Sequence, residues 1–246
     1  MKRCLALFTL CFCFGFSKNL ITVTTKPYEK LIQEIAGESY QVRSFVPANV
    51  DAHHFHPTAA RVQLHAKDTL WFGTGEPLEK HLGKTRTFVP LGPKGHHQWL
   101  DPVALKEHFA QARDVLSERF PADRSRFESN YKKVAARLDA LESKIRSRLT
   151  RSKPLLAYHP FLDAFCSRFG IELISFEEEG KGMSQKGFEK AAKRARVLGI
   201  TNLIAAPGDA NAERIAKKLG IEVAILDPYS DDILDVIEKA AELAAR

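Results

Sequence analysis

The longest regular pattern in the chain lies at residues 124–150, which read RSRFESNYKKVAARLDALESKIRSRLT. Apolar side chains recur every three or four residues from Phe127 to Leu149, with charged side chains between them. This spacing predicts one amphipathic helix. At about 1.5 Å per residue, the helix would be roughly 35 Å long, the diameter of a small domain. We interpret it as a brace between two lobes; the alternative is a long surface helix of one domain.

Downstream of this helix, predicted strands and helices alternate regularly. Strands are expected at residues 155–158, 171–176, 202–206 and 222–226. Helices are expected between them at residues 161–169, 184–198 and 210–219, and a last helix after Asp231 or Asp232. Such alternation is typical of a parallel sheet with helices on its faces.

The first hundred residues show a looser version of the same alternation. Strands are expected at residues 20–24, 40–46, 69–73 and 88–89, and helices from Pro27, over residues 59–65, and from Asp101-Pro102 to about Phe120. The predicted fold class is therefore α/β, with two lobes that each carry a mainly parallel sheet and flanking helices, joined by a long rigid backbone helix. The predicted boundaries are an N-terminal lobe at 19–123, the linking helix at 124–150 and a C-terminal lobe at 151–246.

Residues 1–18 have the pattern of a signal peptide. Lys2 and Arg3 precede an uncharged stretch from Cys4 to Phe16, which is too short to span a bilayer. The protein is therefore expected to be exported. A lipid anchor at Cys11 or Cys13 is the less favoured alternative, because large residues rather than small ones precede both cysteines.

The charge and cysteine counts depend on this leader. The 246-residue chain carries a net charge of +7, but residues 1–18 hold three cations and no acid, so the remainder carries +4. That remainder has no run of five Lys or Arg, and no nucleic-acid partner is expected. It also keeps only Cys166, which excludes an internal disulfide. We expect Cys166 to be a small buried apolar side chain.

Six of the nine histidines occur in three places that follow predicted strands, namely His53, His54 and His56, then His96 and His97, then His159. Asp227 follows a fourth strand. Ligand sites in open α/β sheets form at the carboxyl ends of strands. Imidazole nitrogens with one carboxylate oxygen suit a divalent transition metal. The isolated residues His65, His81 and His108 are expected to be solvated.

Four motifs occur in order along the chain, and they carry a resemblance to a known family. They are Asp51-Ala-His53-His-Phe55-His-Pro57-Thr58, His97-Gln-Trp99-Leu-Asp101-Pro102, His159-Pro-Phe-Leu-Asp-Ala-Phe165 and Leu226-Asp227-Pro228. In these motifs the chain resembles the solute-binding proteins of bacterial ABC transporters that import zinc or manganese. That group includes zinc-binding periplasmic proteins and streptococcal adhesin lipoproteins. The match covers essentially the whole chain after residue 18.

The resemblance implies a metal site between the two lobes, with His53, His97, His159 and Asp227 as ligands. His54, His56 and His96 remain alternative ligands, because the chain departs from the family pattern next to His53 and His97. One divalent metal ion per chain is expected. His159 is the third ligand along the chain, and in this family a histidine at that position favours Zn²⁺. Against zinc, residues 80–95 lack the His-rich loop that many zinc-binding members carry. Mn²⁺ and Fe²⁺ therefore stay open.

The resemblance further implies a periplasmic monomer that serves a membrane permease and its ATPase, and some relatives have also been described as adhesins. An enzyme is not expected. The rival class is a zinc-dependent hydrolase, which the pair His54-Phe-His56 suggests. It is disfavoured because Pro57-Thr58 stands where an Asp-His pair usually follows such histidines in hydrolases of the metallo-β-lactamase-like fold. The acidic run Glu177-Glu178-Glu179 is open to two interpretations, an extra metal site or a patch that docks the permease.

Overall fold

The structure is a computed structural model that describes residues 19–48, 50, 52–53, 55–82, 87–92, 95–178 and 182–245. The predicted signal peptide and His54 lie outside the described residues. So do Asp51, Glu179 and the side chain of His81.

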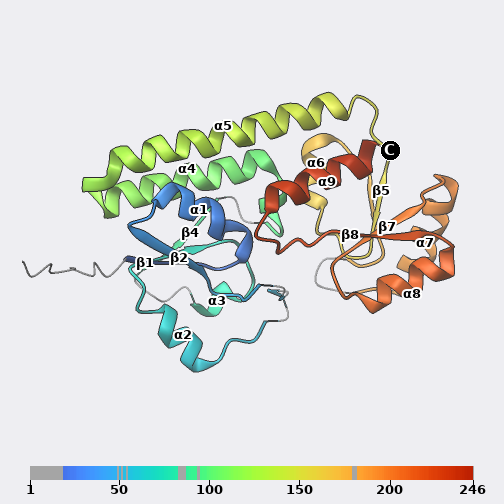
Figure 1. The fold of residues 1–246 in the computed structure, drawn as a ribbon. Helices are drawn as coiled ribbons and strands as arrows, with labels where there is room; N and C mark the ends of the chain where they lie inside the picture. The colour runs from blue at the N-terminus through green and yellow to red at the C-terminus, as the bar shows by residue number, and fades with distance from the viewer. Residues whose placement is uncertain are drawn as a thin grey trace, which may run out of the picture.

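The described chain contains two four-stranded sheets, and every strand pair in them is parallel (Figure 1). The first sheet has the order β2-β1-β3-β4, formed by β1 (Asn19–Val23), β2 (Tyr40–Ser44), β3 (Leu70–Gly73) and β4 (Phe88–Pro90). The second has the order β6-β5-β7-β8, formed by β5 (Leu155–Ala157), β6 (Leu173–Ser175), β7 (Asn202–Ala205) and β8 (Glu222–Ile225). The predicted α/β class with two parallel sheets is confirmed.

Helices connect the strands. In the first half they are α1 (Glu29–Ala36), α2 (Ala59–His65), α3 (Glu79–Leu82) and α4 (Pro102–Arg119). In the second half they are α6 (Asp163–Phe169), α7 (Gln185–Val197), α8 (Ala210–Leu219) and α9 (Ile233–Ala245). The expected caps at Asp101 and Ser184 are present, since each side chain accepts a hydrogen bond from a backbone N–H of the first turn.

The predicted long helix is α5 (Arg124–Arg148), which has 25 residues. Its buried stripe consists of Phe127, Val134, Leu138, Leu141 and Ile145. The helix packs on α1 and α4 in the first half of the chain and on α9 in the second, and it runs along one side of the whole molecule (Figure 1). One continuous buried cluster extends from β1 through α5 to α9. This helix therefore joins the two sheets through a shared apolar core.

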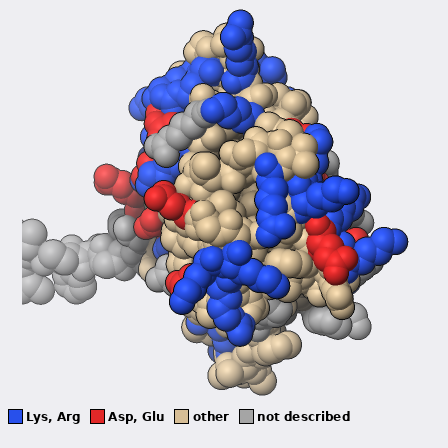
Figure 2. Space-filling model, turned by 90° about the vertical axis from the view of Figure 1, so that its right-hand side faces the viewer, with Lys and Arg blue, Asp and Glu red and all other residues tan. Residues whose placement is uncertain are grey.

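Two helices of the second half, α7 and α8, carry an excess of positive charge. Across α7 and α8 eight Lys and Arg side chains are exposed, against two acidic ones, Glu189 and Glu213. Figure 2 looks at the molecule from the right-hand side of Figure 1, where these helices lie, and blue side chains outnumber red ones there. The modest net charge of the chain is therefore unevenly distributed.

None of the helices in the described ranges combines the length and the apolar composition that crossing a bilayer requires.

Candidate metal centre

Three imidazoles meet at the carboxyl ends of strands from both sheets. His53 lies between β2 and α2, His97 between β4 and α4, and His159 between β5 and α6. One ring nitrogen from each lies within 4.8 Å of the other two. The ring centroids of His53 and His97 are 5.3 Å apart, and those of His97 and His159 are 5.5 Å apart. Three converging nitrogens are the donor set that a divalent transition metal takes from histidine.

The backbone of His97 adopts a left-handed conformation, with φ 52° and ψ 30°. Among the described residues it is the one non-glycine residue with positive φ. Such a conformation is costly and persists only where the surroundings impose it, often at functional sites. Here a 3-10 turn at Gln98–Leu100 follows directly, and the Leu100 amide donates to the His97 carbonyl at 3.0 Å. The turn thereby sets the direction in which His97 leaves the backbone.

His97 is also the most enclosed of the three, with 3% of its surface exposed. Burial lowers the pKa of His97 well below its ordinary value, and the neighbouring rings of His53, His159 and His96 lower it further. The imidazole is consequently neutral across the physiological range, which is the form that binds metal.

Asp227 lies in the loop between β8 and α9, outside this group of three histidines. Its Oδ1 accepts a hydrogen bond from the Tyr229 amide at 2.9 Å. The loop is nevertheless held close to His97, because Trp99 Nε1 donates to the Pro228 carbonyl at 2.7 Å. The Tyr229 ring centroid is 6.1 Å from that of His97. The structure thus brings the Asp227 loop to the cluster and leaves the carboxylate itself outside it.

The alternative ligands differ in their positions. His96 is exposed, with its ring centroid 5.5 Å from that of His53. His56 is exposed and is not a member of the three-histidine group. His54 lies outside the described residues.

Two acidic side chains stand next to the cluster, and neither contact was foreseen. Glu76, which follows β3 and is 4% exposed, has Oε2 3.9 Å from Nε2 of His53. Glu177, which follows β6, has Oε2 3.3 Å from Nδ1 of His159. Both residues follow strands, which is the signal that singled out the histidines. Applied to carboxylates as well, it would have found them.

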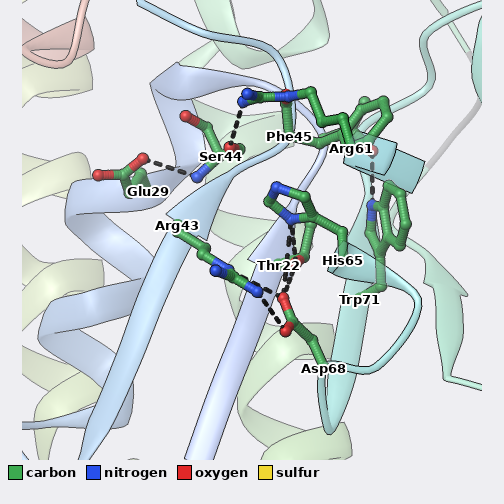
Figure 3. A network of polar contacts seen from close by, with 10 residues as sticks. Thr22, Glu29, Arg43, Ser44, Phe45, Arg61, His65, Asp68 and Trp71 are labelled. Atoms are coloured by element: carbon green, nitrogen blue, oxygen red, sulfur yellow. Dashed lines mark hydrogen bonds and ion pairs between the residues drawn. The ribbon is translucent and has the colours of Figure 1, made fainter. Parts of the chain in front are cut away.

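The expectation that His65 and His108 are solvated is wrong, because they are 3% and 1% exposed. His65 ends α2 where the helix folds against β1, and its Nδ1 lies 2.8 Å from Thr22 Oγ1 (Figure 3). Asp68 bonds the same hydroxyl and also accepts from Arg43 at 2.6 Å. Nδ1 of His108, on the buried face of α4, lies 2.7 Å from the Tyr28 hydroxyl. Both histidines therefore belong to the core. Cys166 is buried as expected.

Arg61 of α2 secures the segment that follows His53. Its Nε donates to the Phe45 carbonyl at 2.6 Å, beyond the end of β2, and Figure 3 shows the side chain lying over this residue. The guanidinium carbon also lies 5.8 Å from the centroid of the Phe55 ring. This arrangement ties Phe55, two residues after His53, to the end of the sheet.

Comparison with known proteins agrees with this architecture. The family model described as zinc-uptake complex component A periplasmic (ZnuA) matches residues 21–241. A Thermotoga maritima protein, provisionally named a metal-binding protein, is 30% identical over 189 residues, covering 71% of this chain and 70% of its own. The Streptococcus mutans metal ABC transporter substrate-binding lipoprotein SloC is 23% identical, covering 84% and 79%. A crystal structure of ZnuA has the same fold, with a TM-score of 0.82 at 21% identity over 92% of this chain and 97% of that one.

Proposed function

The chain belongs to the zinc-uptake complex component A (ZnuA) family of metal-binding solute-binding proteins, and on this premise we propose that it captures a divalent transition metal outside the inner membrane and delivers it to an ABC-transporter permease. The metal is the cargo of the protein. The observation that carries the proposal is the group of three imidazoles from His53, His97 and His159, whose nitrogens converge within 4.8 Å.

The proposed ligands are these three histidines, with Asp227 as the fourth. The Asp227 loop is tied to the His97 loop by the bond between Trp99 and Pro228, which supports Asp227 as the candidate for the fourth ligand. His96 is the alternative to Asp227, because its ring lies 5.5 Å from that of His53. The ligands come from both proposed lobes, 19–123 and 151–246.

Zinc is the proposed cargo. Three imidazole nitrogens and one carboxylate oxygen bind Zn²⁺ more tightly than Mn²⁺ or Fe²⁺ in the Irving–Williams order. The matched family is named for zinc uptake. A buried neutral His97 favours the same borderline-soft ion over the hard cations that prefer oxygen ligands.

The proposed partner is a membrane permease with its ATPase, and the proposed place of action is the periplasm, with the protein as a monomer. The relative SloC is named as the substrate-binding component of a metal ABC transporter. We propose no catalytic activity, since the family is one of binding proteins.

Metal analysis of protein purified without a tag or chelator tests the proposal. The wild type is expected to carry about one zinc ion per chain, and His97→Ala and His159→Ala to lose most of it. His56→Ala is the matched control, because His56 is exposed and not part of the cluster. Unchanged metal content in both His97→Ala and His159→Ala would overturn the proposed site.

A further inference from the structure

One carboxylate stands directly behind a histidine of the cluster. Glu177 Oε2 lies 3.3 Å from Nδ1 of His159. A carboxylate accepts hydrogen bonds and does not donate them when it is ionised. The proton in this contact therefore sits on Nδ1 of the imidazole, and Nε2, on the opposite side of the ring, is then the unprotonated nitrogen that carries the lone pair.

The backbone explains why Glu177 reaches this position. Strands β5 and β6 are neighbours, and their pairing continues past their ends. The Phe176 amide donates to the Ala157 carbonyl at 3.2 Å, and the Glu177 amide to the Tyr158 carbonyl at 3.0 Å. Glu177 is thus held beside the Tyr158-His159 pair by the register of the sheet, and its place does not depend on a freely moving loop.

The carboxylate is itself supported by further side chains. The hydroxyl of Tyr158, a side chain that is 6% exposed, lies beside the Glu177 carboxylate. The Tyr158 hydroxyl in turn accepts from Asn211 Nδ2 at 3.2 Å. A tyrosine hydroxyl is protonated at neutral pH, so it has a proton to donate to a carboxylate. Asn211 lies in the first turn of α8, whose cap is Asp209. The chain of contacts therefore ends on a rigid helix.

We propose that Glu177 is a positioning residue for the metal centre, which holds His159 in the Nδ1–H tautomer and presents Nε2 to the metal. The inference rests on the proposed function and goes beyond it, since it assigns a role to the first residue of the acidic run. Partners of this kind orient a metal-binding imidazole and raise its basicity. Glu177 does so without touching the metal.

The tautomer can be measured without metal. Nitrogen NMR of histidine-labelled, metal-free protein distinguishes the two ring nitrogens of His159, identified by its absence in His159→Ala. The wild type is expected to show the Nδ1–H form, and Glu177→Ala a mixture of both forms. Glu177→Gln keeps a carbonyl acceptor and is expected to retain the Nδ1–H form. An Nε2–H form in the wild type, or no change in Glu177→Ala, would overturn the inference.

Metal affinity, measured by competition with a chelator, gives the second readout. Glu177→Ala is expected to bind zinc about 10- to 100-fold more weakly, as is usual for the loss of such a partner. Glu177→Gln should recover part of the loss. Glu178→Ala is the matched control, since it removes the next charge of the same acidic run, and it should bind as the wild type does. Wild-type affinity in Glu177→Ala, or an equal loss in Glu178→Ala, would contradict the assignment.

The two proposals fail in different ways. If His159→Ala keeps its metal, the proposed ligand set is wrong. If His159→Ala loses its metal while Glu177→Ala keeps both the affinity and the tautomer of the wild type, only the positioning role is wrong.

Should Glu177→Ala fail to fold, Glu177→Gln and Tyr158→Phe carry the test, because Tyr158→Phe removes one support of the carboxylate and leaves the carboxylate in place. In that case both variants are expected to bind zinc more weakly than the wild type, and wild-type affinity in both would contradict the inference.

Discussion

Trp99 Nε1 donates a 2.7 Å hydrogen bond to the carbonyl oxygen of Pro228, which lies 129 residues further along the chain. Two residues after Trp99, Asp101 accepts from Nε of Arg168 on α6 at 2.8 Å. The segment from His97 to Asp101 therefore contacts both the loop of Asp227 and the helix that follows His159. These two contacts link the first half of the cluster to the second.

Replacing Trp99 by Phe should destabilise the protein and weaken metal binding together. Phe lacks the N–H and leaves the buried Pro228 carbonyl without this donor, which costs about 1–3 kcal/mol of unfolding free energy. Urea unfolding of metal-free protein measures the stability, and chelator competition measures the affinity.

Trp71→Phe is the matched control, because Trp71 is equally buried and its Nε1 donates to Thr24 Oγ1 at 3.2 Å within the first sheet. It should lose stability and keep its zinc affinity. The same loss of affinity in both variants would show that the Trp99 contact has no special role at the metal centre.

Arg168→Gln tests the second contact. Asp101 is 5% exposed, and removing its cationic partner leaves a buried carboxylate with fewer hydrogen bonds. Losing a hydrogen bond to a charged group costs about 1.5–3 kcal/mol of unfolding free energy. Arg194→Gln breaks a comparable two-bond pair with Glu172 on the surface, where solvent screening should make the loss of stability much smaller. Equal losses in the two variants would contradict a structural role for the buried pair.

Local patterns predicted most of the fold. The apolar stripe of α5 and the caps of α4 and α7 each depend on residues close in sequence, so the helix ends were placed within a few residues. The Trp99–Pro228 bond joins residues 129 positions apart, and no periodicity reports such a pair. Parallel strands are joined by long crossover connections. The order of the strands in each sheet decides which loops lie side by side, and no single segment of the sequence predicts that order.

For the proposed metal centre, the sequence identified which residue types follow strands but not how these residues pack against one another. His53, His97 and His159 were found because they follow strands, and the structure brings them together. His65 was misjudged because its surroundings are supplied by Thr22 and Asp68, the first of them 43 residues away. Glu177 belongs to an acidic run that was interpreted as an extra metal site or a patch that docks the permease, and the register of β6 against β5 places it beside His159.

Stability should depend on pH through the two core histidines. Burial is the main cause that lowers the pKa of both His65 and His108 to about 4. The unfolded chain has histidine pKa values of about 6.5. Between these values the unfolded state binds more protons than the native state. The contribution of each neutral, buried histidine to the free energy of unfolding is complete above pH 6.5. It is lost as the pH falls towards 4, by about 3 kcal/mol for each histidine.

Urea unfolding in the presence of a chelator, at pH 7.5, 5.5 and 4.5, measures this dependence. His108→Gln replaces a titratable side chain by a neutral one, so its unfolding free energy should fall less steeply over the same interval. A slope equal to that of the wild type would mean that His108 is not kept neutral in the native state.

Metal should stabilise the native protein by mass action. A ligand at 100 times its dissociation constant adds about 2.7 kcal/mol to the free energy of unfolding. Thermal unfolding is expected to shift upwards with zinc, and less with manganese at the same concentration, because three imidazoles favour zinc. His97→Ala should abolish the zinc shift. A larger shift with manganese would reverse the proposed metal preference.

The last prediction concerns how far the two sheets move when metal binds. Helix α5 packs on α1 and α4 as well as on α9, and Arg148 near its end pairs with Glu242 at 3.0 Å. Opening the molecule at the cluster would also break the contacts of Trp99 and Asp101. At about 1–3 kcal/mol each, these two bonds alone disfavour an open state by roughly 30-fold or more.

Small-angle scattering should therefore give the same radius of gyration, roughly 17 Å for a compact protein of this size, with zinc and with a chelator. Trp99→Phe combined with Arg168→Gln removes both bonds and leaves α5 intact. If these bonds hold the sheets together, the metal-free double variant should have a larger radius, and zinc should restore the smaller one. A large contraction of the wild type on adding zinc would instead mean that the metal, and not the protein contacts, closes the molecule.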